Sequence, residues 1–315
     1  MRVVFAGTPA LAVPALQKAF SVCTVVGVLT TPDQPSGRGR ALVASPVKEA
    51  ARELGVPVFE RETADQVREL APDLLVVAAY GRIFKKAFLD AFPMGGINVH
   101  PSLLPRHRGP SPISAAILGG DAQTGVTIQR VAMKFDTGDI LEQQVYPLHG
   151  DETTASLTVA LSAIGADLLA ALLKKMQEGA APPARAQVEA HATYCHLVKK
   201  EEGIIDWSEA AEVIERKVRA FEPWPRSATF IEEKNLLVLK SHVYPDTLGQ
   251  DVSTVTPGTV FAANDRHGLL VRTGKGVLAV ERLQLQFKKP MEWKAFWNGH
   301  PEIIGTRLGK QAEGI

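Results

Sequence analysis

Residues 96–109 read GINVHPSLLPRHRG, and residues 135–140 read FDTGDI. The alternating apolar positions before Pro101 predict the end of a buried strand, because proline cannot donate a hydrogen bond within a sheet. Asn98 and His100 stand two residues apart on this strand, so their side chains point to the same face. In an open parallel sheet, ligands bind beyond the carboxyl ends of the strands. We therefore expect a functional site at this strand end.

The residue types at this strand end suit acyl transfer. A histidine exchanges a proton near neutral pH, and an asparagine amide can donate a hydrogen bond to an oxyanion. A carboxylate can hold the imidazole in one orientation, and spacing alone leaves both Asp136 and Asp139 open for that role. No convincing serine or cysteine nucleophile stands beside them, which favours direct transfer to an amine over an acyl-enzyme. Taken alone, an Asn-x-His pair also fits a purely structural strand end.

Composition excludes several classes of function. The chain has 315 residues, 45% of them hydrophobic, which predicts two domains with ordinary cores. The formal net charge is +1, so any contact with nucleic acid would come from local patches. Cys23 and Cys195 form no metal or redox motif, which is typical of a reducing compartment. The absence of a GxGxxG fingerprint argues against NAD. We expect no signal peptide, because Gly7, Pro9 and Pro14 interrupt the first apolar run. We expect no membrane span, because no stretch reaches 18 apolar residues.

Helical and strand patterns alternate through the first half of the chain, which predicts a doubly wound, Rossmann-like α/β domain. Apolar runs at residues 3–6, 25–29 and 73–80 predict buried strands. Residues 124–132 and 140–148 predict a hairpin around the FDTGDI turn.

A long helix is expected from Thr153 within the α/β domain, and its apolar stripe predicts a core-facing helix. The pattern changes further along the chain. From Ala228 onwards, short strands with turns between them predict a small barrel or sandwich. The pattern therefore predicts a second, all-β domain at the C-terminus.

Residues 30–46 form a long connection between a strand and a helix, and they contain Gly37-Arg38-Gly39-Arg40. Arginine on a flexible backbone suits contact with phosphate groups. A solvated loop whose charge is incidental fits the composition equally well.

The motifs NVHPSLLPRHRG, GVTI and DTGDI together closely resemble the formyltransferases that use 10-formyltetrahydrofolate. That resemblance implies that Asn98, His100 and Asp136 are catalytic. Pro101 departs from the family pattern, which often has glycine there. The resemblance also implies a folate-binding loop made of Ser102, Leu103, Leu104 and Pro105.

Other motifs extend the resemblance over nearly the whole chain, and they point to the methionyl-tRNA formyltransferases within that group. The PDQPSGRGR stretch at 32–40 is similar to a loop that reaches the tRNA acceptor arm, which implies that Arg38 and Arg40 bind tRNA. Residues 194–208 resemble the segment that joins the two domains of the family. The FEPWP motif at 221–225 is similar to a family motif that precedes an OB-like barrel.

The resemblance implies a formyltransferase catalytic domain at 1–185, a linker at 186–206 and a tRNA-binding, OB-like β-barrel domain at 207–315. We expect the chain to transfer the formyl group of 10-formyltetrahydrofolate to the amino group of methionyl initiator tRNA, for translation initiation. We also expect a cytoplasmic monomer that uses no metal and has no membrane partner.

Two alternatives share this chemistry: a sugar-nucleotide N-formyltransferase and a formyltetrahydrofolate hydrolase. Both would lack the Arg38 loop and the FEPWP barrel in this form. An alternative of another class is an RNA-binding module with a catalytically dead α/β domain. The intact set of Asn98, His100 and Asp136 argues against that module.

Overall fold

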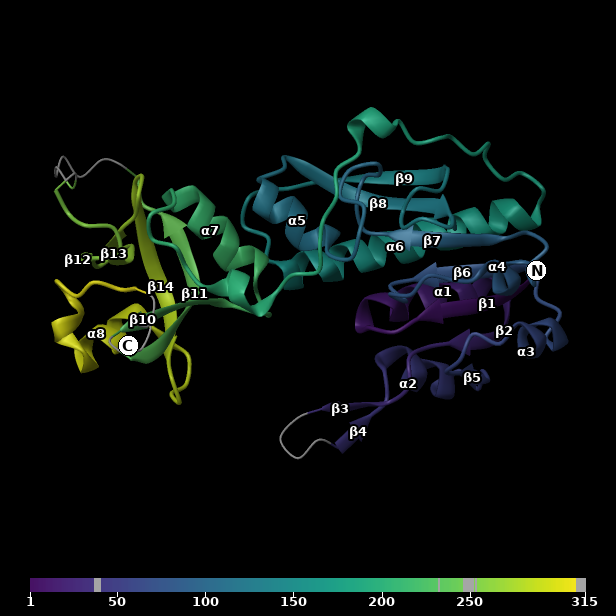
Figure 1. The fold of residues 1–315 in the computed structure, drawn as a ribbon, viewed down its shortest axis with the longest axis horizontal. Helices are drawn as coiled ribbons and strands as arrows, with labels where there is room; N and C mark the ends of the chain where they lie inside the picture. The colour runs from purple at the N-terminus through teal and green to yellow at the C-terminus, as the bar shows by residue number, and fades with distance from the viewer. Residues whose placement is uncertain (37–40, 232, 246–251, 253, 310–315) are drawn as a thin grey trace. The chain divides into compact units, whose positions relative to one another are not determined.

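The computed structural model describes residues 1–36, 41–231, 233–245, 252 and 254–309 (Figure 1). The chain divides into two compact units. The first unit comprises Met1–Ala116, Ala122–Leu148 and Ser156–Leu197, and the second comprises Ile117–Asp121, His149–Ala155 and Val198–Ile315.

A seven-stranded sheet forms the centre of the first unit, in the order β5-β2-β1-β6-β7-β8-β9. The strands from β5 to β7 are parallel, whereas β8 runs antiparallel to both β7 and β9. The strands are β1 (Arg2–Gly7), β2 (Thr24–Leu29), β5 (Val58–Phe59), β6 (Leu74–Ala78), β7 (Gly96–His100), β8 (Gln123–Arg130) and β9 (Ile140–Pro147).

Helices cover both faces of this sheet, as the doubly wound prediction requires. Alternate residues of β1 serve two separate cores: Val3 and Phe5 pack with α1, α2 and α6, whereas Val4 and Ala6 pack with α3 and α4. The fold class expected from the sequence is therefore confirmed. The helices of this part of the chain are α1 (Val13–Val22), α2 (Pro46–Glu53), α3 (Ala64–Glu69), α4 (Lys86–Leu89), α5 (Pro112–Gly119) and α6 (Thr154–Gln177).

The connection at 30–46 contains more structure than the sequence pattern predicts. Strands β3 (Gln34–Ser36) and β4 (Ala41–Val43) pair antiparallel and form a small separate sheet (Figure 1). Leu42 and Val43 of this hairpin are 69% and 52% exposed. Because the hairpin buries little apolar surface, its sequence carries no alternating hydrophobic signal.

Helix α6 is long and apolar enough to cross a membrane by length and composition, and 39% of that segment is buried within the protein. One such helix is weak evidence for a membrane span, because core helices share these properties. Leu169, Leu172, Leu173 and Met176 pack into the core that α1 and α2 also cover. The apolar stripe predicted from the sequence is thus a packing surface of the first unit.

The second unit contains an antiparallel sheet in the order β10-β11-β14-β13-β12, with β15 paired to β14. Residues 306–309 hydrogen-bond to the chain at both edges: Val260 N donates to the Thr306 carbonyl, and Gly309 N donates to the Phe230 carbonyl. This segment therefore bridges the two edge strands, β10 and β12, through isolated contacts. The strands are β10 (Ser227–Ile231), β11 (Lys234–Val243), β12 (Val260–Asn264), β13 (Gly268–Arg272), β14 (Val277–Leu285) and β15 (Met291–Glu292).

Two helices pack on this second sheet. Ile214 and Val218 of α7 (Ala211–Ala220) and Phe296 of α8 (Trp293–Gly299) are buried in one core with alternate strand residues. The sequence pattern predicts α7 but not α8, because a helix of two turns carries too few apolar repeats to detect.

Candidate active site

Strand β7 places Asn98 and His100 at the expected position. It pairs in parallel with β6, where Val77 lies opposite Asn98, and antiparallel with β8, where Thr127 lies opposite His100. Pairing on both sides fixes the register, so the two side chains share one face. The His100 side chain is only 6% exposed. The sheet therefore holds both groups rigidly at one strand end.

The turn between β8 and β9 brings Asp136 to the same place. Asp136 Oδ1 lies 3.5 Å from His100 Nδ1, and Asn98 Nδ2 donates to this oxygen over 3.3 Å. Asp139, the other carboxylate of the turn, is exposed, and its backbone carbonyl accepts from Arg130 N. The structure thus brings together Asn98, His100 and Asp136 and leaves Asp139 outside the cluster.

Further donors converge on the Asp136 carboxylate. Gln129 Nε2 donates to Oδ1 over 2.8 Å, and the Gly109 backbone N–H donates to Oδ2 over 2.9 Å. Hydrogen bonds to an ionised carboxylate are stronger than neutral ones, and several together fix its position. The carboxylate is therefore held in a defined place beside the imidazole.

The second ring nitrogen of His100 also has a partner. His100 Nε2 lies 3.0 Å from the His107 carbonyl oxygen, which can only accept a hydrogen bond. The hydrogen bond at one ring nitrogen sets which nitrogen carries the proton. In the neutral imidazole, the proton is therefore on Nε2, and the Nδ1 lone pair faces Asp136.

The loop at 102–105 is anchored through its backbone. Thr127 Oγ1 donates to the Ser102 carbonyl over 2.6 Å and accepts from Leu104 N, and Gln143 Nε2 donates to the Leu104 carbonyl over 2.9 Å. The side chains of Ser102 and Leu104 are buried, whereas Leu103 and Pro105 are partly exposed. The loop is therefore a rigid wall that presents backbone and Pro105 to the surface.

Arg38 and Arg40 lie outside the described residues. Strands β3 and β4 on either side of them pair as a hairpin, with Pro35 opposite Leu42.

Comparison with known proteins shows which family this chain belongs to. A family model described as formyl transferase matches residues 1–173, and one described as the formyl transferase C-terminal domain matches residues 197–301. The methionyl-tRNA formyltransferase of Treponema denticola is 43% identical over 96% of this chain and 98% of its own length. The methionyl-tRNA formyltransferase of Roseiflexus castenholzii is 44% identical over 98% of this chain and 99% of its own length.

The chain belongs to the methionyl-tRNA formyltransferase family. The resemblance found in the sequence is therefore confirmed, for both the N-terminal and the C-terminal part. The solved structure of an N-formyltransferase from Helicobacter canadensis, in complex with folinic acid and dTDP-3-aminofucose, shares the fold with a TM-score of 0.65. It is 17% identical over 88% of this chain and 98% of that chain, so the likeness concerns the fold. The linker bounds at 186–206 stay a prediction.

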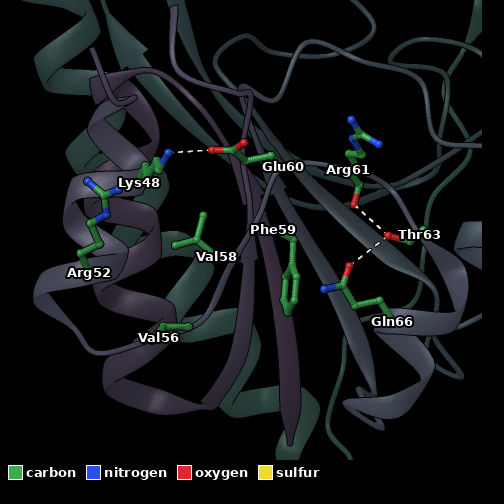
Figure 2. A pocket seen from close by; sticks show the side chains of 9 residues that line it. All are labelled: Lys48, Arg52, Val56, Val58, Phe59, Glu60, Arg61, Thr63 and Gln66. Carbon is green, nitrogen blue, oxygen red and sulfur yellow. Dashed lines mark hydrogen bonds and ion pairs between the residues drawn. The ribbon is translucent and has the colours of Figure 1, made fainter. Parts of the chain in front are cut away.

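A hollow of about 600 Å³ at the β5 edge is a separate feature of this formyltransferase family member (Figure 2). Val58 and Phe59 of β5 form its apolar wall, and neither His100 nor Asp136 lines it. Lys48 Nζ in this hollow contacts Asp33 Oδ1 at 2.6 Å and Glu60 Oε1 at 2.7 Å. The hydrogen bond to Asp33, followed by the one to Glu60, raises the pKa of Lys48. Two carboxylates thus pair with this ammonium, and the residues that line the hollow include no histidine, serine or cysteine.

Sequence reasoning missed the groups that hold His100 and Asp136 in place. They are the Gln129 amide, the Gly109 N–H and the His107 carbonyl. Gln129 had a usable signal, since it lies opposite Asn98 in the register of β7 with β8. The Gly109 N–H and the His107 carbonyl gave no signal in the sequence, because a backbone contact does not depend on residue type.

Proposed function

We propose that this chain transfers the formyl group of 10-formyltetrahydrofolate to the amino group of methionine on initiator tRNA, for translation initiation. The observation that carries the proposal is the cluster of Asn98 and buried His100 at the end of β7 with Asp136 of the adjacent turn. It lies in a chain that matches methionyl-tRNA formyltransferases over nearly its full length. A charged tRNA is a cytoplasmic substrate, so we propose that this protein acts in the cytoplasm. We also propose that it acts as a monomer.

In this proposal, His100 is the proton acceptor. When the methionyl nitrogen attacks the formyl carbon, it must lose a proton. The Nδ1 lone pair of His100 takes that proton, because Nε2 already donates to the His107 carbonyl. The resulting imidazolium faces the Asp136 carboxylate at 3.5 Å, so the positive charge that forms on the ring lies beside a negative one.

Asn98 stabilises the negative charge that develops on the formyl oxygen. The formyl oxygen becomes an oxyanion in the tetrahedral intermediate, and the Asn98 amide has two N–H groups. One N–H donates to Asp136, and the second is left for the oxyanion. When the intermediate collapses, the bond from carbon to N10 of the folate breaks, and His100 returns its proton to N10. Tetrahydrofolate and formylmethionyl-tRNA are the products, and no metal takes part.

The 102–105 loop is the proposed wall of the folate site. Its backbone is anchored by Thr127 and Gln143, so it can contact a flat ring without reordering. The proposed contacts come from its backbone groups, Leu103 and Pro105, because Ser102 and Leu104 are buried.

An acceptor comparison tests the proposed function. Radiolabelled 10-formyltetrahydrofolate is offered with methionyl initiator tRNA, with an amino-sugar nucleotide, or with water alone. We expect rapid label transfer to the charged tRNA and background release in the other two reactions. Transfer to the sugar nucleotide at an equal or higher rate would favour a sugar N-formyltransferase, and rapid release to water a hydrolase. A chain that binds tRNA and transfers nothing would be the RNA-binding module.

Arg38 is the residue that we expect to matter for tRNA and not for folate. We predict that Arg38→Ala lowers kcat/KM for charged tRNA about tenfold, since a guanidinium contact to phosphate or a base is worth roughly 1–3 kcal/mol. Arg38→Lys restores part of the activity, because lysine keeps the charge but loses the planar fork. Binding of the folate alone should not change in either variant. Arg40→Ala should weaken tRNA transfer in the same way.

Arg68→Ala is the matched control, since Arg68 is an exposed arginine of α3 that pairs with Asp65. We expect Arg68→Ala to change neither the kcat/KM for charged tRNA nor the binding of folate. If the kcat/KM of Arg38→Ala for charged tRNA stays within about twofold of wild type, the charge of Arg38 is solvated and does not serve tRNA binding. A phosphate contact also predicts that tRNA affinity falls less steeply with salt in Arg38→Ala.

A further inference from the structure

We infer that Gln187 is a positioning residue for this reaction: its side-chain amide holds the turn that carries Asp136. The inference rests on the proposed function, because it assigns a supporting role in the same chemistry. Gln187 follows α6 in sequence and is 51 residues from Asp136. Nothing in its sequence context singles it out.

The Gln187 amide nitrogen reaches both carbonyls that define the turn. Nε2 donates to the Asp136 carbonyl over 2.9 Å and to the Gly138 carbonyl over 2.7 Å. The same nitrogen lies 3.2 Å from Gln129 Oε1, and Gln129 in turn donates to the Asp136 carboxylate. One side chain therefore connects the backbone of the turn with a group that holds the catalytic carboxylate.

The turn has a conformation that needs such support. Asp136 has a positive φ of 54°, which is uncommon for a residue with a side chain. Such conformations persist where the surroundings over-determine them, and they gather at functional sites. At Gly138, an added Cβ would lie 1.8 Å from the Arg130 carbonyl, so the backbone passes very close to β8. Gln187 donates hydrogen bonds to the backbone carbonyls of both constrained residues, Asp136 and Gly138.

Gln187 is itself held from the opposite side. Its Oε1 accepts from Arg108 Nε over 3.0 Å, and Arg108 is 1% exposed. The Arg108 guanidinium also contacts Glu189 at 2.9 Å and Tyr194 Oη at 2.8 Å. The hydrogen bond from Arg108, with a further one from Tyr194, holds the pKa of Glu189 below its usual range. Both the nitrogen and the oxygen of the Gln187 amide are thus hydrogen-bonded, and the buried Arg108 guanidinium holds the oxygen.

The contacts predict how a loss of Gln187 would show in kinetics. Gln187 touches the carbonyls of the turn, so it acts on His100 only through Asp136. The folate-binding loop is anchored by other residues, Thr127 and Gln143. Loss of Gln187 should therefore lower kcat and leave the KM for folate almost unchanged. Displacement of a catalytic group by about 1 Å can cost on the order of 10²-fold in rate.

The test uses two variants and one control in the full-length chain. Gln187→Met keeps the size of the side chain and removes every hydrogen bond, whereas Gln187→Glu keeps an acceptor for Arg108 and replaces the donor by an oxygen. Gln177→Met is the control, because Gln177 Nε2 also donates to a distant backbone carbonyl, that of Val22, over 3.0 Å. Formyl transfer kinetics and amide hydrogen exchange across residues 131–139 are measured for all of them.

We expect both Gln187 variants to lower kcat about 10- to 100-fold, with the KM for folate within about twofold of wild type. Amides of the turn should exchange faster in the Gln187 variants than in wild type, and Gln177→Met should match wild type in both measurements. Full kcat in Gln187→Met, or turn amides that exchange as in wild type, would overturn the inference. If the wild-type protein transfers no formyl group, the proposed function fails, and the exchange data still decide whether Gln187 holds the turn.

Discussion

We expect His100→Ala to lower kcat for formyl transfer by roughly 10²- to 10⁴-fold, the usual contribution of a positioned general acid–base. The loss follows because the amine proton then has no acceptor beside the Asp136 carboxylate, and N10 of the folate has no proton donor. Asn98→Ala should lower kcat about 10²- to 10³-fold, as is typical when one oxyanion donor is removed. Initial rates with saturating folate and charged tRNA measure both changes.

Folate affinity and thermal unfolding are the controls for this pair of variants. His100 is buried, so alanine leaves a small cavity that can lower stability without any effect on mechanism. His100→Asn fills more of this space and should lose as much activity as His100→Ala. An activity of His100→Ala within about threefold of wild type would show that this imidazole is not the proton acceptor.

The second large effect concerns the two carboxylates of the turn. We predict that Asp136→Asn lowers kcat roughly 10²-fold or more, because the imidazolium loses its charged partner. The amide also replaces one carboxylate oxygen by an NH₂ group, so it loses either the hydrogen bonds from Gln129 and Asn98 to Oδ1 or the one from the Gly109 N–H to Oδ2. Asp139→Asn is the matched control at an exposed position of the same turn, and it should retain nearly full activity.

The comparison is made at matched stability, with thermal unfolding measured for both variants. Turnover that survives Asp136→Asn but disappears in Asp139→Asn would mean that Asp139, not Asp136, is the functional carboxylate. Equal losses in the two variants would point to disruption of the turn instead of a specific role for Asp136.

Much of the fold follows from local patterns in the sequence. Continuous apolar runs predicted the central strands, and two alternating stretches predicted the β8–β9 hairpin. Asn98 and His100 were predictable as a pair because the two-residue period of a strand fixes which side chains share a face. The β3–β4 hairpin was not predictable, because its exposed residues bury no apolar face.

The support of the site depends on contacts that no local pattern carries. Arg108 and Gln187 are 79 residues apart, and α5, β8, β9 and α6 lie between them in the chain. A buried arginine looks like a surface arginine in a single sequence, although burial requires it to be paired. The inward orientation of Ser102 and Leu104 was hidden for a related reason, since Thr127 and Gln143 anchor their loop from β8 and β9.

Locating the formyl group after a single turnover tests the proposed transfer and the role of His100 together. Wild-type protein is mixed with 10-formyltetrahydrofolate that carries label in the formyl carbon and with methionyl initiator tRNA, and the aminoacyl ester is then hydrolysed. We predict that the label is recovered as N-formylmethionine in a reaction that His100→Ala suppresses by at least about 10²-fold. Label recovered as free formate, or N-formylmethionine formed at equal rates by both proteins, would contradict it.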